Sequence, residues 1–187
     1  MDLSPIKLEI LEALLLHSEP IRAAQVAKEL GKEFPSVSMH LIGLTRSGHA
    51  YSPIKGSYVI SEKGKEALGL TEVTREKALG ILTPTPLDKA FHFYAGIDKP
   101  LNLHAQDLLQ FCSQIGKVNV DSVEFHFSRG DFQAWFAGLG DSELVKKTAL
   151  LKKKGLKGEE LRVALLDMAE KRCIALSKML GQQVPPI

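Results

Sequence analysis

The first 50 residues place apolar side chains at helical spacing, and this pattern predicts three short helices. The first opens at Ser4-Pro5, because Ser suits the position before a helix and Pro suits its first turn. The second spans about residues 22–30 and stops at Gly31, and the third spans about 35–47. The residues predicted to face inward are Ile6, Ile10, Ala13, Leu14, Val26, Ala27, Leu30, Val37, Leu41 and Leu44.

A β-hairpin is predicted directly after the third helix. Residues 50–53 and 57–60 form two short segments of strand character around a tip that contains Lys55 and Gly56. A further helix should start at residue 61, and another helical segment covers 72–80.

The stretch 81–88 contains two prolines and predicts a linker between domains at 1–80 and 89–187. Beyond it the pattern predicts a strand at 91–95, a helix at 102–115, helix starts near Asp121, Asp131 and Asp141, and a long helix at 158–180. A long amphipathic terminal helix of this kind often packs against a second copy, so we expect the second domain to dimerise the chain or to sense a signal.

Composition adds modest constraints. With 44% hydrophobic and 25% charged residues, no apolar run near the roughly 18 residues of a membrane span and no secretion signal, we expect a cytoplasmic protein without membrane contact. The net charge of +2 is too small to require a polyanionic partner. Within residues 20–65, however, seven basic and three acidic residues give a local excess of +4, which is compatible with phosphate contact. Cys112 and Cys173 fit no metal or redox motif.

Residues 26–50 carry a resemblance to a known family. They read Val26-Ala27-x-x-Leu30-Gly31, a turn, then Val37-Ser38-x-His40-Leu41-x-x-Leu44-x-x-x-Gly48. This resembles the helix-turn-helix of winged-helix regulators of the multiple-antibiotic-resistance and arsenic-repressor type, and residues 58–65 resemble the second wing strand running into the next helix. The resemblance covers about 70 residues and implies an N-terminal winged helix-turn-helix with a short β-hairpin wing. Together with the helices predicted in the second half, this gives a mainly α fold class with a helical C-terminal domain.

The same resemblance implies a DNA-binding transcriptional regulator, a homodimer on double-stranded DNA. Its third helix would enter the major groove. The residues expected to contact DNA are Ser36, Ser38, Met39, His40 and Arg46 from that helix and Lys55 from the wing. For His40 the alternatives are packing and phosphate contact, and for Lys55 they are DNA contact and a solvated turn.

A second hypothesis is an adaptor that binds other proteins and not DNA. The exposed positions of the third helix include Met39 and Ile42, and only Arg46 is a strong cationic donor. An apolar patch of this kind suits a protein partner.

The second half holds a possible effector or functional cluster of His126, Arg129, Asp131 and Trp135. From about Phe91 to Leu176 the chain resembles an uncharacterised module of archaeal and bacterial proteins, which implies no chemistry. Asp131 is expected to cap a helix; the alternative is a His126–Asp131 pair. The aromatic residues around it suit either a small-molecule site or an ordinary core.

We predict no catalytic residue, no cofactor and no metal. His92, His104 and His126 lack a short ligand spacing, and no glycine-rich phosphate loop is present. The lysine-rich run between residues 146 and 157 reads as a solvated helix face.

Overall fold

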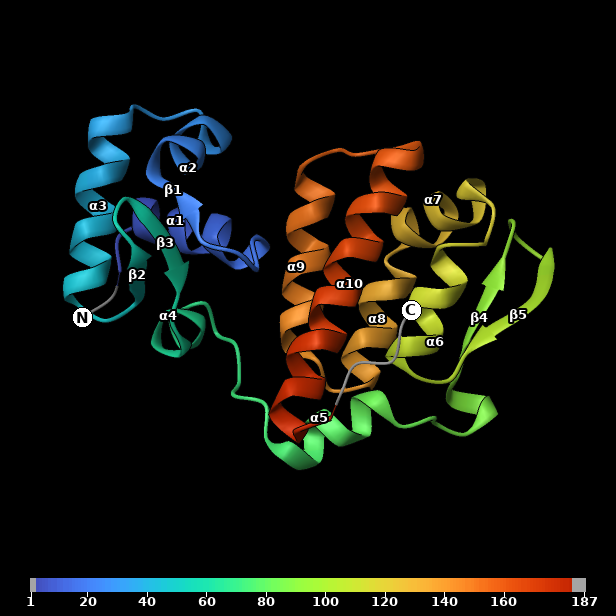
Figure 1. The fold of residues 1–187 in the computed structure, drawn as a ribbon. Helices are drawn as coiled ribbons and strands as arrows, with labels where there is room; N and C mark the ends of the chain where they lie inside the picture. The colour runs from blue at the N-terminus through green and yellow to red at the C-terminus, as the bar shows by residue number, and fades with distance from the viewer. Residues whose placement is uncertain (1–2, 183–187) are drawn as a thin grey trace. The chain divides into compact units, whose positions relative to one another are not determined.

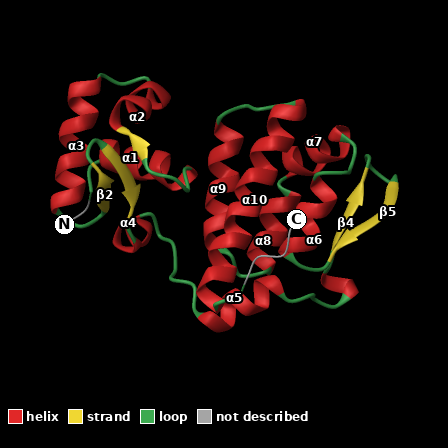
Figure 2. Ribbon diagram, in the orientation of Figure 1, coloured by secondary structure: helices red, strands yellow, loops and turns green. Residues whose placement is uncertain are grey.

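A computed structural model describes residues 3–182 and is mainly helical, with small antiparallel sheets (Figure 1, Figure 2). The chain divides into two compact units, residues 1–72 and 73–187. This division comes before the predicted linker at 81–88, because α5 (Arg75–Leu82) packs on α10 (Gly158–Leu180) and so belongs to the second unit.

The first unit begins with three helices that pack on one another. They are α1 (Pro5–Leu16), α2 (Ala23–Leu30) and α3 (Phe34–Arg46). Pro5 stands in the first turn of α1, and Gly31 ends α2 in the left-handed region at φ 59°, where glycine has no steric penalty. The side chains of Val37, Leu41 and Leu44 in α3 are completely buried, as the apolar spacing predicts.

A small sheet completes the first unit. Its strands are β1 (Ile21–Arg22), β2 (Ala50–Ile54) and β3 (Ser57–Ile60), in the antiparallel order β1-β3-β2. The β2–β3 hairpin is therefore where the sequence predicts it, whereas the two-residue β1 was not predicted. The unit ends with α4 (Glu62–Ala67), whose N-cap Ser61 accepts a hydrogen bond from the backbone of Gly64.

The second unit is built around α10. After α5 come a 3-10 turn (Leu87–Lys89) and a hairpin of β4 (Phe91–Tyr94) and β5 (Pro100–Ala105). Four helices follow: α6 (Leu108–Ile115), α7 (Val120–Arg129), α8 (Asp131–Gly138) and α9 (Ser142–Lys153). Helix α10 packs against α5, α6, α7 and α9, and Figure 1 shows it running alongside α9.

Two expectations for this unit need correction. The predicted helix 102–115 is a strand followed by a helix, because β5 pairs with β4 and Asp107 starts α6 by accepting a hydrogen bond from the Gln110 backbone. The predicted linker is tied to this region, since the Thr85 N–H donates to the Gln106 carbonyl at 2.8 Å. The core is aromatic, and its largest completely or almost completely buried side chains include Phe93, Phe111, Phe132 and Phe136.

Candidate functional sites

Helix α3 presents an exposed face on the side opposite its buried residues. Phe34, Met39 and Ile42 are 52%, 63% and 43% exposed, which is unusual for large apolar side chains gathered on one helix. A depression of about 600 Å³ lies on this face, lined by Phe34, Pro35, Ser38, Met39, Ile42, Gly43 and Arg46.

This depression gathers only part of the predicted DNA contacts. Ser38, Met39 and Arg46 line it, whereas Ser36 and His40 are half-buried residues outside it. Lys55 is exposed near the tip of the β2–β3 hairpin. Phe34 is not among the predicted contacts, although it precedes Ser38 at i, i+4 spacing on the same side of α3.

The cations of the first unit fall into two groups. Some are engaged: Lys32 pairs with Glu9 at 2.9 Å, and the Lys63 ammonium donates to the Ser47 carbonyl at 2.9 Å. Others are exposed and make no ion pair or hydrogen bond of their side chains within residues 3–182, namely Arg22, Lys28, Arg46 and Lys55. These four charges are available to an anionic partner. Burial, followed by the charges of Lys63 and Lys7, lowers the pKa of His49 below its usual 6.5.

In the second unit, His126 connects three elements. Its Nδ1 lies 2.8 Å from Oδ2 of Asp131, and its Nε2 accepts a hydrogen bond of 2.8 Å from the backbone N–H of Tyr94. Since Nε2 accepts, the proton of the neutral ring is on Nδ1 and is donated to the carboxylate. Both ring nitrogens are engaged, so the side chain fastens β4 to α7 and α8 and does not present a free base.

The structure shows the His126–Asp131 pair and overturns the predicted capping role of Asp131. Gly130, at φ 82°, is the N-cap of α8 and has no side chain with which to cap. Asp131 is the first residue of the helix, and its Oδ2 receives His126 and the Nε of Arg129, the latter at 3.2 Å. A carboxylate at this position also interacts favourably with the helix dipole.

A cavity of about 380 Å³ lies next to this pair, between the β4–β5 hairpin and α7. Of the predicted functional cluster, His126, Arg129 and Asp131 line the cavity, but Trp135 does not. The Trp135 ring is 5.7 Å from that of Phe91, which is a lining residue, and its Nε1 donates to the Lys89 carbonyl at 3.1 Å. The predicted cluster is thus split, because three of its residues line the cavity and the half-buried Trp135 lies beside Phe91.

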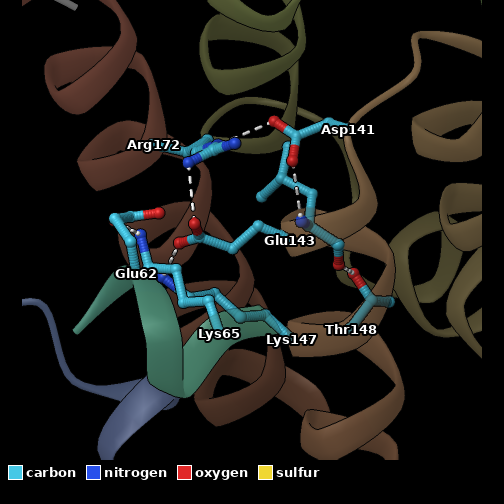
Figure 3. Close-up of polar contacts among 8 residues, drawn as sticks. Glu62, Lys65, Asp141, Glu143, Lys147, Thr148 and Arg172 are labelled. Carbon is cyan, nitrogen blue, oxygen red and sulfur yellow. Dashed lines mark hydrogen bonds and ion pairs between the residues drawn. The ribbon is translucent and has the colours of Figure 1, made fainter. Parts of the chain in front are cut away.

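A network of charged side chains joins α9 to α10 (Figure 3). The Arg172 guanidinium donates from Nε to Asp141 at 2.7 Å and from Nη1 to Glu143 at 2.8 Å, and Glu143 also pairs with Lys147 at 2.8 Å. Asp141 caps α9 as predicted, because its Oδ1 accepts from the Leu144 backbone N–H. The predicted purely solvated lysine face is wrong at Lys147, which is 5% exposed and paired. The two cations, Arg172 and Lys147, are balanced by the two anions, Asp141 and Glu143, so the network has a structural role.

Other groups that could carry chemistry do not assemble into a site. His92 and His104 are cross-strand neighbours with rings 6.0 Å apart, and within residues 3–182 no three His, Cys, Asp or Glu side chains are placed to hold a metal ion. Cys112 and Cys173 are buried with their sulfurs 3.9 Å apart. The contact with Cys173 and burial raise the pKa of the Cys112 thiol, which keeps it protonated.

Comparison with protein-family models, with curated proteins and with solved structures finds no match to this chain. Among residues 3–182, no helix combines the length and the apolar character that a membrane crossing requires.

Proposed function

We propose that the first unit is a winged helix-turn-helix that binds double-stranded DNA, in a homodimeric transcriptional regulator. The observation that carries this proposal is the arrangement of α3. One face packs completely on α1 and α2 through Val37, Leu41 and Leu44, and the opposite face is exposed. A helix held in this way after a short turn is the element that other helix-turn-helix proteins place in the major groove.

The distribution of charge supports the same proposal. Arg46 stands at the end of α3, and Lys55 is exposed near the hairpin tip. The register of the sheet pairs Arg22 with Ser57, which places a third exposed cation beside the hairpin tip. In the proposed complex these side chains contact phosphates, Ser38 hydrogen-bonds a base edge and Met39 touches a thymine methyl group.

The proposal is tested by fluorescence anisotropy of a labelled duplex with the full chain between about 50 and 200 mM salt. Each cation that contacts a phosphate contributes about 0.9 to the slope of log affinity against log salt. The double variant Arg46→Ala/Lys55→Ala should therefore bind more weakly, with a slope shallower by about 1.8. The matched control is Lys117→Ala/Lys178→Ala, which removes two exposed lysines from the second unit. Equal slopes for wild type and the Arg46/Lys55 variant would reject phosphate contact by these residues.

The exposed apolar side chains of α3 favour a second candidate function. Phe34, Met39 and Ile42 suit the docking of a partner's apolar helix face better than they suit a polar groove. An adaptor of this kind would have no salt-dependent affinity for DNA. Met39→Asp would abolish its partner binding, whereas Lys55→Ala would leave that binding intact.

A further inference from the structure

We propose that the cavity between the β4–β5 hairpin and α7 binds a small monocarboxylate with an aromatic body. The cavity belongs entirely to the second unit, and the proposal does not depend on DNA binding by the first. Its volume of about 380 Å³ lies in the range of small-molecule sites, which is about 300–1,000 Å³.

Arg129 supplies the group that recognises the carboxylate. Its Nε is held by Asp131 at 3.2 Å, and its guanidinium carbon lies 5.1 Å from the centre of the Phe125 ring. The two terminal nitrogens have no hydrogen-bond partner among residues 3–182. Asp131 thus orients the guanidinium from its Nε edge and Phe125 from one face. The remaining edge, with the two terminal nitrogens, can form the two parallel hydrogen bonds that a carboxylate accepts.

The His126–Asp131 pair explains why Arg129 is pre-organised. Asp131 is held by the buried imidazole, whose other nitrogen is fixed by the Tyr94 backbone. The Asp131 carboxylate is therefore shared between His126 and Arg129. The hairpin sets the orientation of this carboxylate, because Tyr94 of β4 fixes the His126 ring. Pre-organisation of this kind lowers the entropic cost of binding.

Aromatic side chains provide the walls for the apolar body of the ligand. Phe91, Tyr94 and Phe125 all line the cavity, and Ile97 lines it from the hairpin loop. Ile97 is 73% exposed, so a ligand would remove apolar surface of this side chain from water. The loop is ordered by its own backbone, since the Ala95 N–H donates to the Lys99 carbonyl at 2.9 Å.

Asp98 restricts the charge of the ligand. It lines the same cavity and lies in the left-handed region at φ 57°, an unusual conformation that the tight hairpin loop imposes. A second carboxylate in the cavity repels dianions such as phosphate monoesters more strongly than it repels a monocarboxylate. We therefore commit to a singly charged ligand.

The experiment is a calorimetric titration of the full chain with phenylacetate, compared with benzyl alcohol, phenethylamine and phenyl phosphate. Phenylacetate should bind most tightly of the four. Arg129→Gln should weaken it about tenfold or more, because one charged hydrogen-bonding partner is lost. The matched control is Arg162→Gln, an arginine of α10 that pairs with Glu159 and does not line the cavity.

Three spectroscopic readouts separate loss of binding from loss of fold. Phenylacetate should shift the backbone amide signals of residues 95–99 and change the fluorescence of Trp135, the only tryptophan. The far-ultraviolet circular dichroism of Arg129→Gln should match that of the wild type. Arg129→Lys, which keeps the charge but not the fork, should bind with intermediate affinity.

Four results would overturn the proposal. They are the absence of both heat and amide shifts with phenylacetate, equal affinity of wild type and Arg129→Gln, equal affinity for phenylacetate and benzyl alcohol, and tighter binding of phenyl phosphate or phenethylamine.

Discussion

Replacement of His126 by alanine tests whether this side chain is a structural fastener. The imidazole is 3% exposed and uses both nitrogens, one with the Tyr94 backbone and one with Asp131. Alanine removes both hydrogen bonds and leaves the Tyr94 N–H without its acceptor. It also removes a ring that packs edge-on against Phe91 at 4.9 Å.

The expected cost follows from these losses. Each hydrogen bond contributes about 1 kcal/mol net, and the part-buried Tyr94 N–H left without an acceptor costs about 1 kcal/mol more. The space left by the ring adds to this, as in other truncations of large buried side chains. The free energy of unfolding of the second unit should therefore fall by about 3–5 kcal/mol, a large part of the 5–15 kcal/mol typical of a domain.

Urea unfolding followed by Trp135 fluorescence measures this change, because the only tryptophan reports on the second unit. The matched control is His92→Ala in the same hairpin. His92 is exposed and makes one hydrogen bond, to the Leu87 carbonyl, so its loss should cost less than about 1 kcal/mol. A cost for His126→Ala no larger than that of the control would refute the structural role. An increase in stability would point instead to a functional group held at the expense of stability.

Three further predictions concern a glycine, a histidine and the two cysteines. Gly64→Ala should destabilise the first unit by about 2 kcal/mol or more in thermal unfolding, since the added Cβ would lie 2.1 Å from the carbonyl oxygen of His49; an unchanged melting temperature contradicts this. The pKa of His49, measured by NMR, should lie below 6.5, because burial and the charge of Lys63 lower it. Since the folded protein then binds the proton less readily than the unfolded chain, the contribution of His49 to stability is complete above pH 6.5 and declines as the pH falls below that value. Lys63→Gln should raise that pKa, and no upward shift would reject the charge effect. Cys112 and Cys173 should resist a thiol reagent until the protein unfolds; rapid labelling of the native chain contradicts their burial.

Local patterns predicted the first unit well. Helix α3 was expected at 35–47 and is found at Phe34–Arg46. The reason is that Val37, Leu41 and Leu44 recur at helical spacing, so a helix buries all three on one face. The hairpin was equally visible from its alternation and its glycine at the tip. Strand β1 is too short to leave any periodicity, since it exists only by pairing with β3.

The error at residues 102–115 arose where the alternating pattern of a strand runs into the 3.6-residue pattern of a helix. Leu101, Leu103 and Ala105 alternate as in a strand, but they run directly into the helical spacing of α6. The signal that separates them is Asp107, which caps α6. An aspartate between an alternating segment and a segment of helical spacing marks the start of a new helix, so Asp107 was the signal that the preceding residues form a separate strand.

Tertiary contacts account for the remaining differences. Sequence cannot show that α5 packs on α10, so the unit boundary was placed after that helix instead of before it. The role of Asp131 was misjudged for a similar reason. A side chain at a helix start can cap the helix or turn to a neighbour, and His126 is a suitable neighbour only because Tyr94, far away in the sequence, fixes its ring.

The most direct measurement of the proposed function is DNA cleavage by an iron chelate attached to Ser36→Cys on α3. The buried Cys112 and Cys173 leave the introduced thiol as the site of labelling. The matched control carries the chelate at Glu66→Cys, an exposed position of α4 in the same unit. We predict strand cleavage in a bound duplex from the α3 label, with little from the α4 label. Bound duplex that is left intact by the α3 label, or cut equally by both, would contradict the placement of α3 in the major groove.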